Sequence, residues 1–167
     1  MGYKDDVAQI KKFFENIKLE EVMDKQVVTI REDADGSEAQ VKFINNKINH
    51  LIVIDADKKV VGLISRKYLY KTQSPRKIMQ EEMDYEPGIV IDGDSFYEKE
   101  TLDNIILSNI MFRNPFTLGP QDKLAKAVKA MGERFIACIP IVDANQKVIG
   151  VITDLEVIRF IAKILSL

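Results

Sequence analysis

The sequence predicts an α+β protein built from two repeats of the order β-α-β-β-α, which pair about a pseudo-twofold axis and follow an N-terminal helix. The first observation is a pair of hairpin patterns, residues 51–64 and 139–152, in which two short β-branched runs flank a polar turn. The second is that a hydroxyl residue, Ser65 or Thr153, opens a helical pattern after each hairpin. The third is the constant spacing, because these two residues lie 88 positions apart.

An ungapped comparison of residues 22–69 with residues 110–157 supports the repeat. The identical pairs are Met23/Met111, Thr29/Thr117, Ala39/Ala127, Ile48/Ile136, Asp55/Asp143, Ala56/Ala144, Lys59/Lys147, Val60/Val148, Gly62/Gly150 and Ile64/Ile152. A unit of this size is marginally stable alone. We therefore expect the two units to bury a shared core, with a cleft on each side of the pseudo-twofold axis.

The composition is that of a globular domain, with 46% hydrophobic and 30% charged residues among 167. No apolar run approaches the roughly 20 residues that span a bilayer, and the start lacks the apolar core of a signal peptide. The net charge of −2 comes from scattered charges without a basic stripe, which argues against nucleic-acid binding. One Cys and one His leave little for a disulfide or a metal cluster. We expect a cytoplasmic protein.

The first half follows the predicted order. Apolar spacing predicts an amphipathic helix over 3–17, which either packs on its own domain or contributes to a dimer contact. A β-type run over 27–30 precedes a helix over 34–46, with Ser37 as its cap and Ile44 facing inward. The hairpin 51–64 and a helix from Ser65 to about residue 71 complete the first unit.

The second half begins after residues 72–100, which are rich in Pro, Gly and acidic residues and predict a long irregular connection. The following elements are expected to be a helix over 101–112, a strand over 115–118, a helix over 122–134, the hairpin 139–152 and a helix over about 154–165. The predicted divisions are an N-terminal helix over 1–18, a first repeat over 19–71, a linker over 72–106 and a second repeat over 107–167.

Short motifs in the two units carry a family resemblance. They are Val27-Val28-Thr29-Ile30 with Pro115-Phe116-Thr117-Leu118, the strand end from Ile139 to Asp143, and Gly62-Leu63-Ile64-Ser65 with Gly150-Val151-Ile152-Thr153. On these residues, the chain resembles a tandem pair of CBS domains, called a Bateman module, over 19–71 and 107–165. A chain of 167 residues leaves no room for an attached enzyme or channel domain, so it resembles the stand-alone kind of CBS protein.

The resemblance implies a regulatory module and not an enzyme. Such a module binds adenosine-containing ligands (AMP, ADP, ATP or S-adenosylmethionine) in clefts between the units, and the family commonly forms homodimers. No other cofactor and no metal is implied. The protein partner that would be regulated is unknown.

In the family, the Ser or Thr that opens the last helix is followed three residues later by Asp or Asn. Thr153 fits the phosphate-binding hydroxyl, and Glu156 stands at the ribose-binding position with one extra methylene. Ser65 fits in the first unit, but Tyr68 stands where the carboxylate belongs. The second cleft is therefore the better formed of the two.

Further positions complete the implied ligand-binding set. Thr29 and Thr117 match the polar position near the base and ribose, and Arg66 could supply charge to phosphates. Ile139 and Pro140 belong to the strand-end motif on which the resemblance rests, and they are also included.

Two alternatives remain open. The Thr153-x-x-Glu156 pattern is also a helix capping box, which needs no ligand. The substitutions at Tyr68 and Glu156 also fit a non-catalytic dimerisation or protein-interaction module with degenerate clefts. An enzyme is disfavoured, because the sequence shows no nucleophile with its base, metal cluster or Gly-rich phosphate loop.

Overall fold

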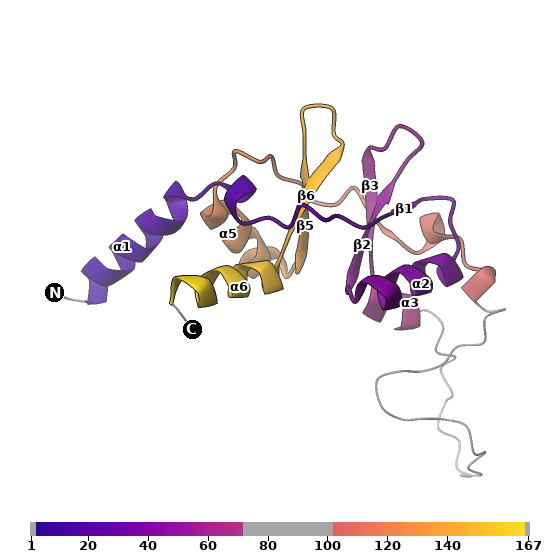
Figure 1. Ribbon diagram of the computed structural model, residues 1–167, viewed down its shortest axis with the longest axis horizontal. Coiled ribbons are helices and arrows are strands. Elements are labelled where there is room, and N and C mark those ends of the chain that lie inside the picture. Colours follow the sequence, from indigo (N-terminus) through magenta and orange to yellow (C-terminus); the bar gives the residue numbers. More distant parts are fainter. Residues whose placement is uncertain (1–2, 72–101, 166–167) are drawn as a thin grey trace, which may run out of the picture.

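The computed structural model describes residues 3–71 and 102–165, so the predicted connection over 72–100 lies outside the described residues. Two units lie side by side, with their hairpins directed the same way and helices gathered at the opposite end of the strands (Figure 1). Helix α1 (Tyr3–Asn16) projects from one end of the molecule. The predicted α+β fold class is confirmed.

The elements follow the expected order. The first unit contains η1 (Leu19–Glu21), β1 (Thr29–Arg31), α2 (Gly36–Asn46), β2 (His50–Ile54), β3 (Val60–Ser65) and α3 (Arg66–Lys71). The second contains η2 (Leu107–Asn109), β4 (Phe112–Arg113), α5 (Leu124–Arg134), β5 (Cys138–Val142), β6 (Val148–Thr153) and α6 (Asp154–Ile164).

Strand pairing repeats between the units. In the first unit β1 runs parallel to β2, which pairs antiparallel with β3, and β3 also pairs antiparallel with β4 from the second unit. In the second unit β5 and β6 form the hairpin, while single bridges at Leu118–Ile141 and Asp24–Val151 replace the two outer pairings. A bridge between Lys59 and Lys147 joins the two hairpins.

The segments that lead into the two units are exchanged between them. Leu19 and Met23 lie at the start of the first unit in sequence but pack in the core of the second, whereas Leu107 and Met111, at the start of the second unit, pack in the core of the first. The glycines of β3 and β6 make room for these methionines, since a Cβ at Gly62 would collide with the Met111 thioether. A Cβ at Gly150 would collide in the same way with Met23. The repeat in sequence is thus an intertwined pair in space.

Helix ends differ in part from expectation. Asp35, not Ser37, is the N-cap of α2, and its carboxylate accepts a hydrogen bond of 2.8 Å from the Glu38 amide. Ala39 and Phe43 are buried on the inner face of α2, but Ile44 is 55% exposed, so its predicted inward placement is wrong. The helix ends at Lys47, which adopts a left-handed conformation with φ 52°.

The predicted helix over 101–112 is also wrong. Within the described residues 102–112, α-helical conformation is limited to residues 102–103, and the 3-10 helix η2 and strand β4 follow. The backbone of this segment bonds instead to the start of α2: the Gly36 amide donates to the Ile105 carbonyl and the Leu107 amide to the Ala34 carbonyl. Tertiary pairing therefore overrides the local helical pattern. The strand predicted over 115–118 is reduced to the bridge at Leu118.

Helix α1 packs one part of its apolar face against the second unit and leaves the other part exposed. Phe14 contacts the core of the second unit, whereas Val7, Ile10 and Phe13 are each at least 45% exposed. Among the described helices, none combines the length and the apolar character needed to cross a membrane.

Candidate ligand-binding clefts

Two clefts lie where the second strand of each hairpin meets the helix that follows it, at β3–α3 and at β6–α6. The polar cleft has a volume of about 340 Å³ and is lined by residues from 24–28, 46–52 and 151–159. The aromatic cleft has a volume of about 430 Å³ and is lined by residues from 63–68, 110–112 and 135–138. His50 and Cys138 line both clefts and therefore form the wall between them.

The two clefts are related by the repeat but differ in chemistry. At the spacing of the repeat, Phe112, Phe135, Ser65 and Tyr68 of the aromatic cleft correspond to Asp24, Lys47, Thr153 and Glu156 of the polar cleft. Three of the four pairs exchange a charged side chain for an aromatic one. The fold thus supplies two similar cavities, and their side chains make one cavity charged and the other aromatic.

A connected set of side chains lies in the polar cleft at the start of α6. The Thr153 side chain caps the helix by accepting from the Glu156 amide at 3.4 Å, and its hydroxyl donates to the Glu156 carboxylate. The other carboxylate oxygen pairs with the Arg159 guanidinium at 3.1 Å. Because the Glu156 side chain is only 13% exposed and Arg159 is 68% exposed, a shielded carboxylate lies beneath an accessible cation.

This arrangement is suited to a ligand that carries hydroxyl and charged groups. A carboxylate can accept hydrogen bonds from two neighbouring ribose hydroxyls. Arg159 and Lys47 can pair with anionic groups, while Asp24 and Asp154 add negative charge to the same cleft. The cleft therefore offers sites for both signs of charge.

The shared wall is uncharged at neutral pH. Burial lowers the pKa of His50, an effect that the negative charge of Asp154 partly opposes. Burial, followed by the charges of Glu156 and Asp154, raises the pKa of the Cys138 thiol to about 12. Cys138 is thus an unreactive thiol. In the described part of the chain, no three His, Cys, Asp or Glu side chains are grouped to hold a metal ion.

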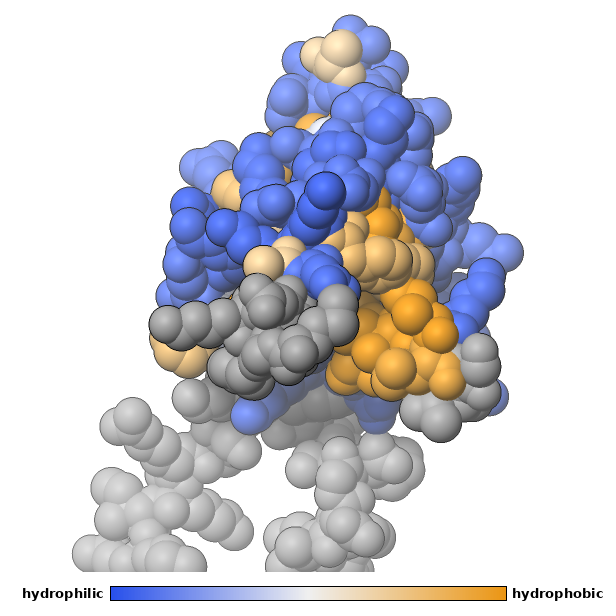
Figure 2. Space-filling view, turned by 90° about the vertical axis from the view of Figure 1, so that its left-hand side faces the viewer, coloured by the Kyte–Doolittle hydropathy of each residue, from blue (hydrophilic) through white to orange (hydrophobic). Residues whose placement is uncertain are grey.

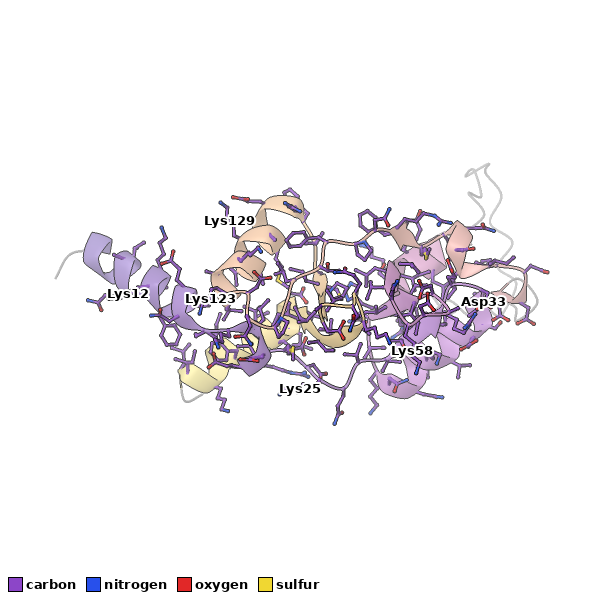
Figure 3. The ribbon with its side chains drawn as sticks, turned by 90° about the horizontal axis from the view of Figure 1, so that it is seen from above. Lys12, Lys25, Asp33, Lys58, Lys123 and Lys129 are labelled. Carbon is purple, nitrogen blue, oxygen red and sulfur yellow. The ribbon has the colours of Figure 1, made fainter. Side chains whose placement is uncertain are left out.

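The structure distributes the predicted site residues over several places. Thr153 and Glu156 line the polar cleft, and Ser65 lines the aromatic cleft. The Ser65 hydroxyl accepts from the Tyr68 amide at 3.1 Å and so caps α3. Thr29 lies instead in a third cavity, of about 330 Å³, together with Lys25, Lys58 and Lys147. Figure 3 looks down on the hairpins and labels two of these lysines.

The remaining predicted residues line neither cleft. Ile139 is fully buried in the core of the second unit, and Pro140 lies in the buried strand β5, where its carbonyl accepts from the Leu118 amide. Thr117 precedes that bridge and is half-buried. The Arg66 amide donates to the Asn49 carbonyl at 2.9 Å at the start of α3.

Several lining residues were missed from the sequence. Asp24 and Phe112 reach the clefts only because the leading segments are exchanged, which no local pattern signals. Lys47 and Phe135 lie there because a helix ends at each in a left-handed conformation, with φ of 52° and 54°. Arg159 could have been found, since it lies one helical turn beyond Glu156 on the same face.

This paired fold with inter-unit clefts is that of a CBS domain pair. A family model of the CBS domain matches residues 19–74 and again residues 107–163. The chain belongs to the CBS domain family and contains two such domains. The resemblance stated from the motifs is confirmed.

Solved structures share the fold. A CBS domain pair in complex with 5′-methylthioadenosine and S-adenosyl-L-methionine has a TM-score of 0.66 and 20% identity, with coverage of 88% of this chain and 97% of that one. CBSX2 in complex with AMP has a TM-score of 0.67 and 18% identity, with coverage of 89% and 98%.

The sequence is also similar to a longer enzyme. It is 24% identical over 149 residues to the homoserine O-acetyltransferase of Methanohalobium evestigatum. This match covers 89% of the chain but only 25% of the enzyme. The chain thus spans about a quarter of the length of the curated relatives it matches first.

Proposed function

We propose that this protein is a regulatory module that binds an adenosine-containing ligand (AMP, ADP, ATP or S-adenosylmethionine) in the polar cleft. The observation that carries the proposal is the shielded Glu156 carboxylate, held between the Thr153 hydroxyl and Arg159 inside a cavity of about 340 Å³. A cavity of this volume falls in the range of small-molecule sites. Adenosine-containing ligands in two structurally similar CBS domain pairs support the ligand class.

The extra methylene of Glu156 does not prevent the proposed role. Its carboxylate already lies in the cleft, and ribose hydroxyls would replace or share the hydrogen bond from Thr153. Arg159 would then be released toward a phosphate or a carboxylate of the ligand. Catalysis is not part of the proposal, and the matched quarter of the acetyltransferase fits a regulatory segment.

A thermal-shift panel of AMP, ADP, ATP, S-adenosylmethionine and NAD at millimolar levels tests the proposal. A ligand at about a hundredfold excess over its Kd should raise Tm by roughly 5–10 °C. The variant Glu156→Gln should lose most of the shift, because the Gln amide has one acceptor oxygen where the carboxylate has two. The matched control is Glu133→Gln, whose carboxylate pairs with Lys129 on the exposed side of α5. No stabilisation of the wild type by any of these ligands would contradict the proposal.

The exposed apolar faces of α1 and α6 support a homodimer. The largest exposed fractions there are Ile10 58%, Ile158 61% and Leu165 60%, with Val7, Ile161 and Ile164 beside them. Figure 2 views the end of the molecule that carries these helices, and apolar side chains gather in one area of it. We propose that this area is covered by a second copy in a cytoplasmic homodimer.

Light scattering after size-exclusion chromatography tests the dimer. The variant Ile158→Glu should give a monomer mass, because it places a charge in the buried contact. The variant Val41→Glu is the control, since Val41 is 53% exposed but belongs to α2. A wild-type mass of one chain at micromolar concentration would overturn the homodimer.

The alternative is a non-catalytic interaction module with degenerate clefts. It is favoured by Tyr68, which replaces the carboxylate of the first unit. It predicts the dimer but no shift with any ligand of the panel, so the two measurements separate the alternatives.

A further inference from the structure

The third cavity, which we call the lysine cavity, carries an inference that is separate from both clefts. It has a volume of about 330 Å³, and three lysines from three segments line it. Lys25 precedes β1, Lys58 lies in the turn between β2 and β3, and Lys147 lies directly before β6. No Asp or Glu is among its described lining residues. Three positive charges thus share one cavity in a chain whose net charge is −2.

These three lysines lack the ion pairs that lysines on the helices form. Lys126, for example, pairs at 2.8 Å with Asp122, one turn away on α5. Within residues 3–71 and 102–165, no carboxylate forms an ion pair with Lys25, Lys58 or Lys147. Their ammonium groups are therefore available to a ligand.

The acidic side chains of the two hairpin turns do not neutralise the lysine cavity. The Asp55 carboxylate accepts from the Lys59 amide at 2.8 Å, and the Asp143 carboxylate accepts from the Lys147 amide at 2.9 Å. Both acids thus stabilise the backbone of their own turns. Asp57 is exposed and does not line the cavity. Like charges that share a cavity repel one another, and an anion bound between them would remove this cost.

The repeat shows that the positive charge is not a general property of the fold. At the spacing of the repeat, Lys25, Lys58 and Lys147 correspond to Arg113, Gln146 and Lys59. Gln146 is uncharged, and the Arg113 guanidinium donates to the Ser108 carbonyl at 2.6 Å. The corresponding place in the other half therefore keeps one lysine of the three. The cluster of free cations is a feature of one side of the molecule.

Residues 24–29 separate the lysine cavity from the polar cleft. The even-numbered residues of this segment line the polar cleft only, whereas Lys25 and Thr29 line the lysine cavity only. Val27 lines both. Such alternation is typical of extended backbone, whose side chains point to opposite sides in turn. The lysine cavity is thus a separate site that lies behind the polar cleft.

The cations and the floor of the cavity indicate the chemistry of its ligand. Lysine supplies a compact point charge that suits phosphate, whereas arginine suits the planar fork of a carboxylate. A phosphate monoester carries a charge of about −1.5 to −2 and three acceptor oxygens, which matches several lysines better than a single carboxylate does. The Thr29 hydroxyl offers one more donor. The floor consists of half-buried aliphatic side chains, which are Val27, Ile54, Val148 and Ile149.

We propose that the lysine cavity binds a small phosphorylated molecule with an apolar or aromatic body. Lys25, Lys58 and Lys147 hold the phosphate, and the body of the ligand lies on the aliphatic floor. The volume of about 330 Å³ falls in the range of small-molecule sites. Because residues 24–29 form a wall of both sites, a ligand here contacts the segment that also shapes the polar cleft.

Isothermal titration with phenyl phosphate tests the proposal. At pH 8, above the second phosphate pKa of about 6, this probe is a dianion with an apolar ring. Phenyl sulfate has the same ring and a tetrahedral group with one charge fewer, and phthalate carries two carboxylates on the ring. Phenyl phosphate should bind saturably to the wild type at millimolar concentration. Phenyl sulfate and phthalate should each bind about fivefold more weakly or worse.

Variants locate the site. Lys58→Gln installs the residue of the corresponding turn, and the two positions share a left-handed backbone with φ of 64° and 63°. Lys58→Gln and Lys147→Gln should each weaken phenyl phosphate by about fivefold or more at unchanged Tm. Lys12→Gln is the matched control, because it removes the same charge from α1 at one end of the molecule, away from Lys25 and Lys58 (Figure 3). Its affinity should stay within about twofold of the wild type.

Four outcomes would overturn the proposal. The first is the absence of saturable binding of phenyl phosphate, and the second is an equal loss of affinity in Lys12→Gln, which would show an effect of overall charge. The third is tighter binding of phthalate, which would show a carboxylate site. The fourth is binding that Arg159→Gln abolishes and Lys58→Gln leaves intact, which would place the anion in the polar cleft.

Failure of the proposed adenosine site would be recognised separately. Glu156→Gln changes the polar cleft and leaves the lining of the lysine cavity intact. The affinity for phenyl phosphate should therefore be the same in Glu156→Gln as in the wild type, whether or not any nucleotide raises Tm in the thermal panel.

Discussion

Thr153 ends strand β6, caps helix α6 and lies inside the polar cleft. Its side chain accepts from the Glu156 amide, which is the capping interaction expected from sequence. The Glu156 carboxylate, however, accepts from the Thr153 hydroxyl and not from the Thr153 backbone amide, which the second half of a capping box requires. The carboxylate is thus directed into the polar cleft.

Changes at Thr153 separate the cap from the ligand contact. Thr153→Ala should lower the free energy of unfolding by about 0.5–2 kcal/mol, because the first turn of α6 loses its side-chain acceptor. Thr153→Ser keeps the hydroxyl and should lie close to the wild type. Urea denaturation without ligand measures both, and an unchanged stability of Thr153→Ala would show that the side chain does not act as a cap.

At the scale of elements, the exchange of leading segments sets the positions of both clefts. It brings Asp24 against β6 and Phe112 against β3. Met23 and Met111 then occupy the spaces left by Gly150 and Gly62. These two identical pairs of the repeat therefore have one physical explanation.

Alanine at these glycines tests the exchange. Gly62→Ala should destabilise the protein by roughly 1–3 kcal/mol, because the new methyl overlaps the Met111 side chain. Adding Met111→Ala should recover part of the loss. Gly132→Ala is the matched control: its Cβ meets nothing within 4 Å, and in the interior of α5 it should stabilise by about 1 kcal/mol. Equal effects of the two alanines would contradict the packing.

The sequence allowed the local elements to be predicted but not the contacts between distant segments. The hairpins and their helices follow from β-branched runs, polar turns and capping hydroxyls, which are all local signals. The segment from 101 to 112 has a helical pattern as well, but the start of α2 captures its backbone. Residues that reach the clefts from that segment, such as Phe112, were therefore not predicted.

The part of the candidate cleft that could be predicted from sequence is the start of helix α6. Thr153 and Glu156 were placed in a cleft by their spacing, and the structure has both there. Thr29 and Ile139 were predicted only from their positions in family motifs. Thr29 lies in another cavity, and Ile139 lies in the core. The ligand-binding role of all four residues stays a prediction.

At the scale of the whole molecule, a doubled fold has produced two unequal cavities. The polar cleft combines Glu156 with cations and acids, and the aromatic cleft combines three rings with an uncharged wall. His50 and Cys138 separate the two cavities. A ligand in one cleft would thus touch residues that also line the other, which provides a direct route for coupling.

Isothermal titration of the wild type and Glu156→Gln with AMP and with S-adenosylmethionine tests the central claim most directly. We predict one site per chain for at least one of the two ligands and a loss of about tenfold or more in affinity in Glu156→Gln. Tyr68→Phe, which changes only the corresponding position of the aromatic cleft, should bind as the wild type does. Binding that is absent in the wild type, or unaffected by Glu156→Gln, would contradict the account.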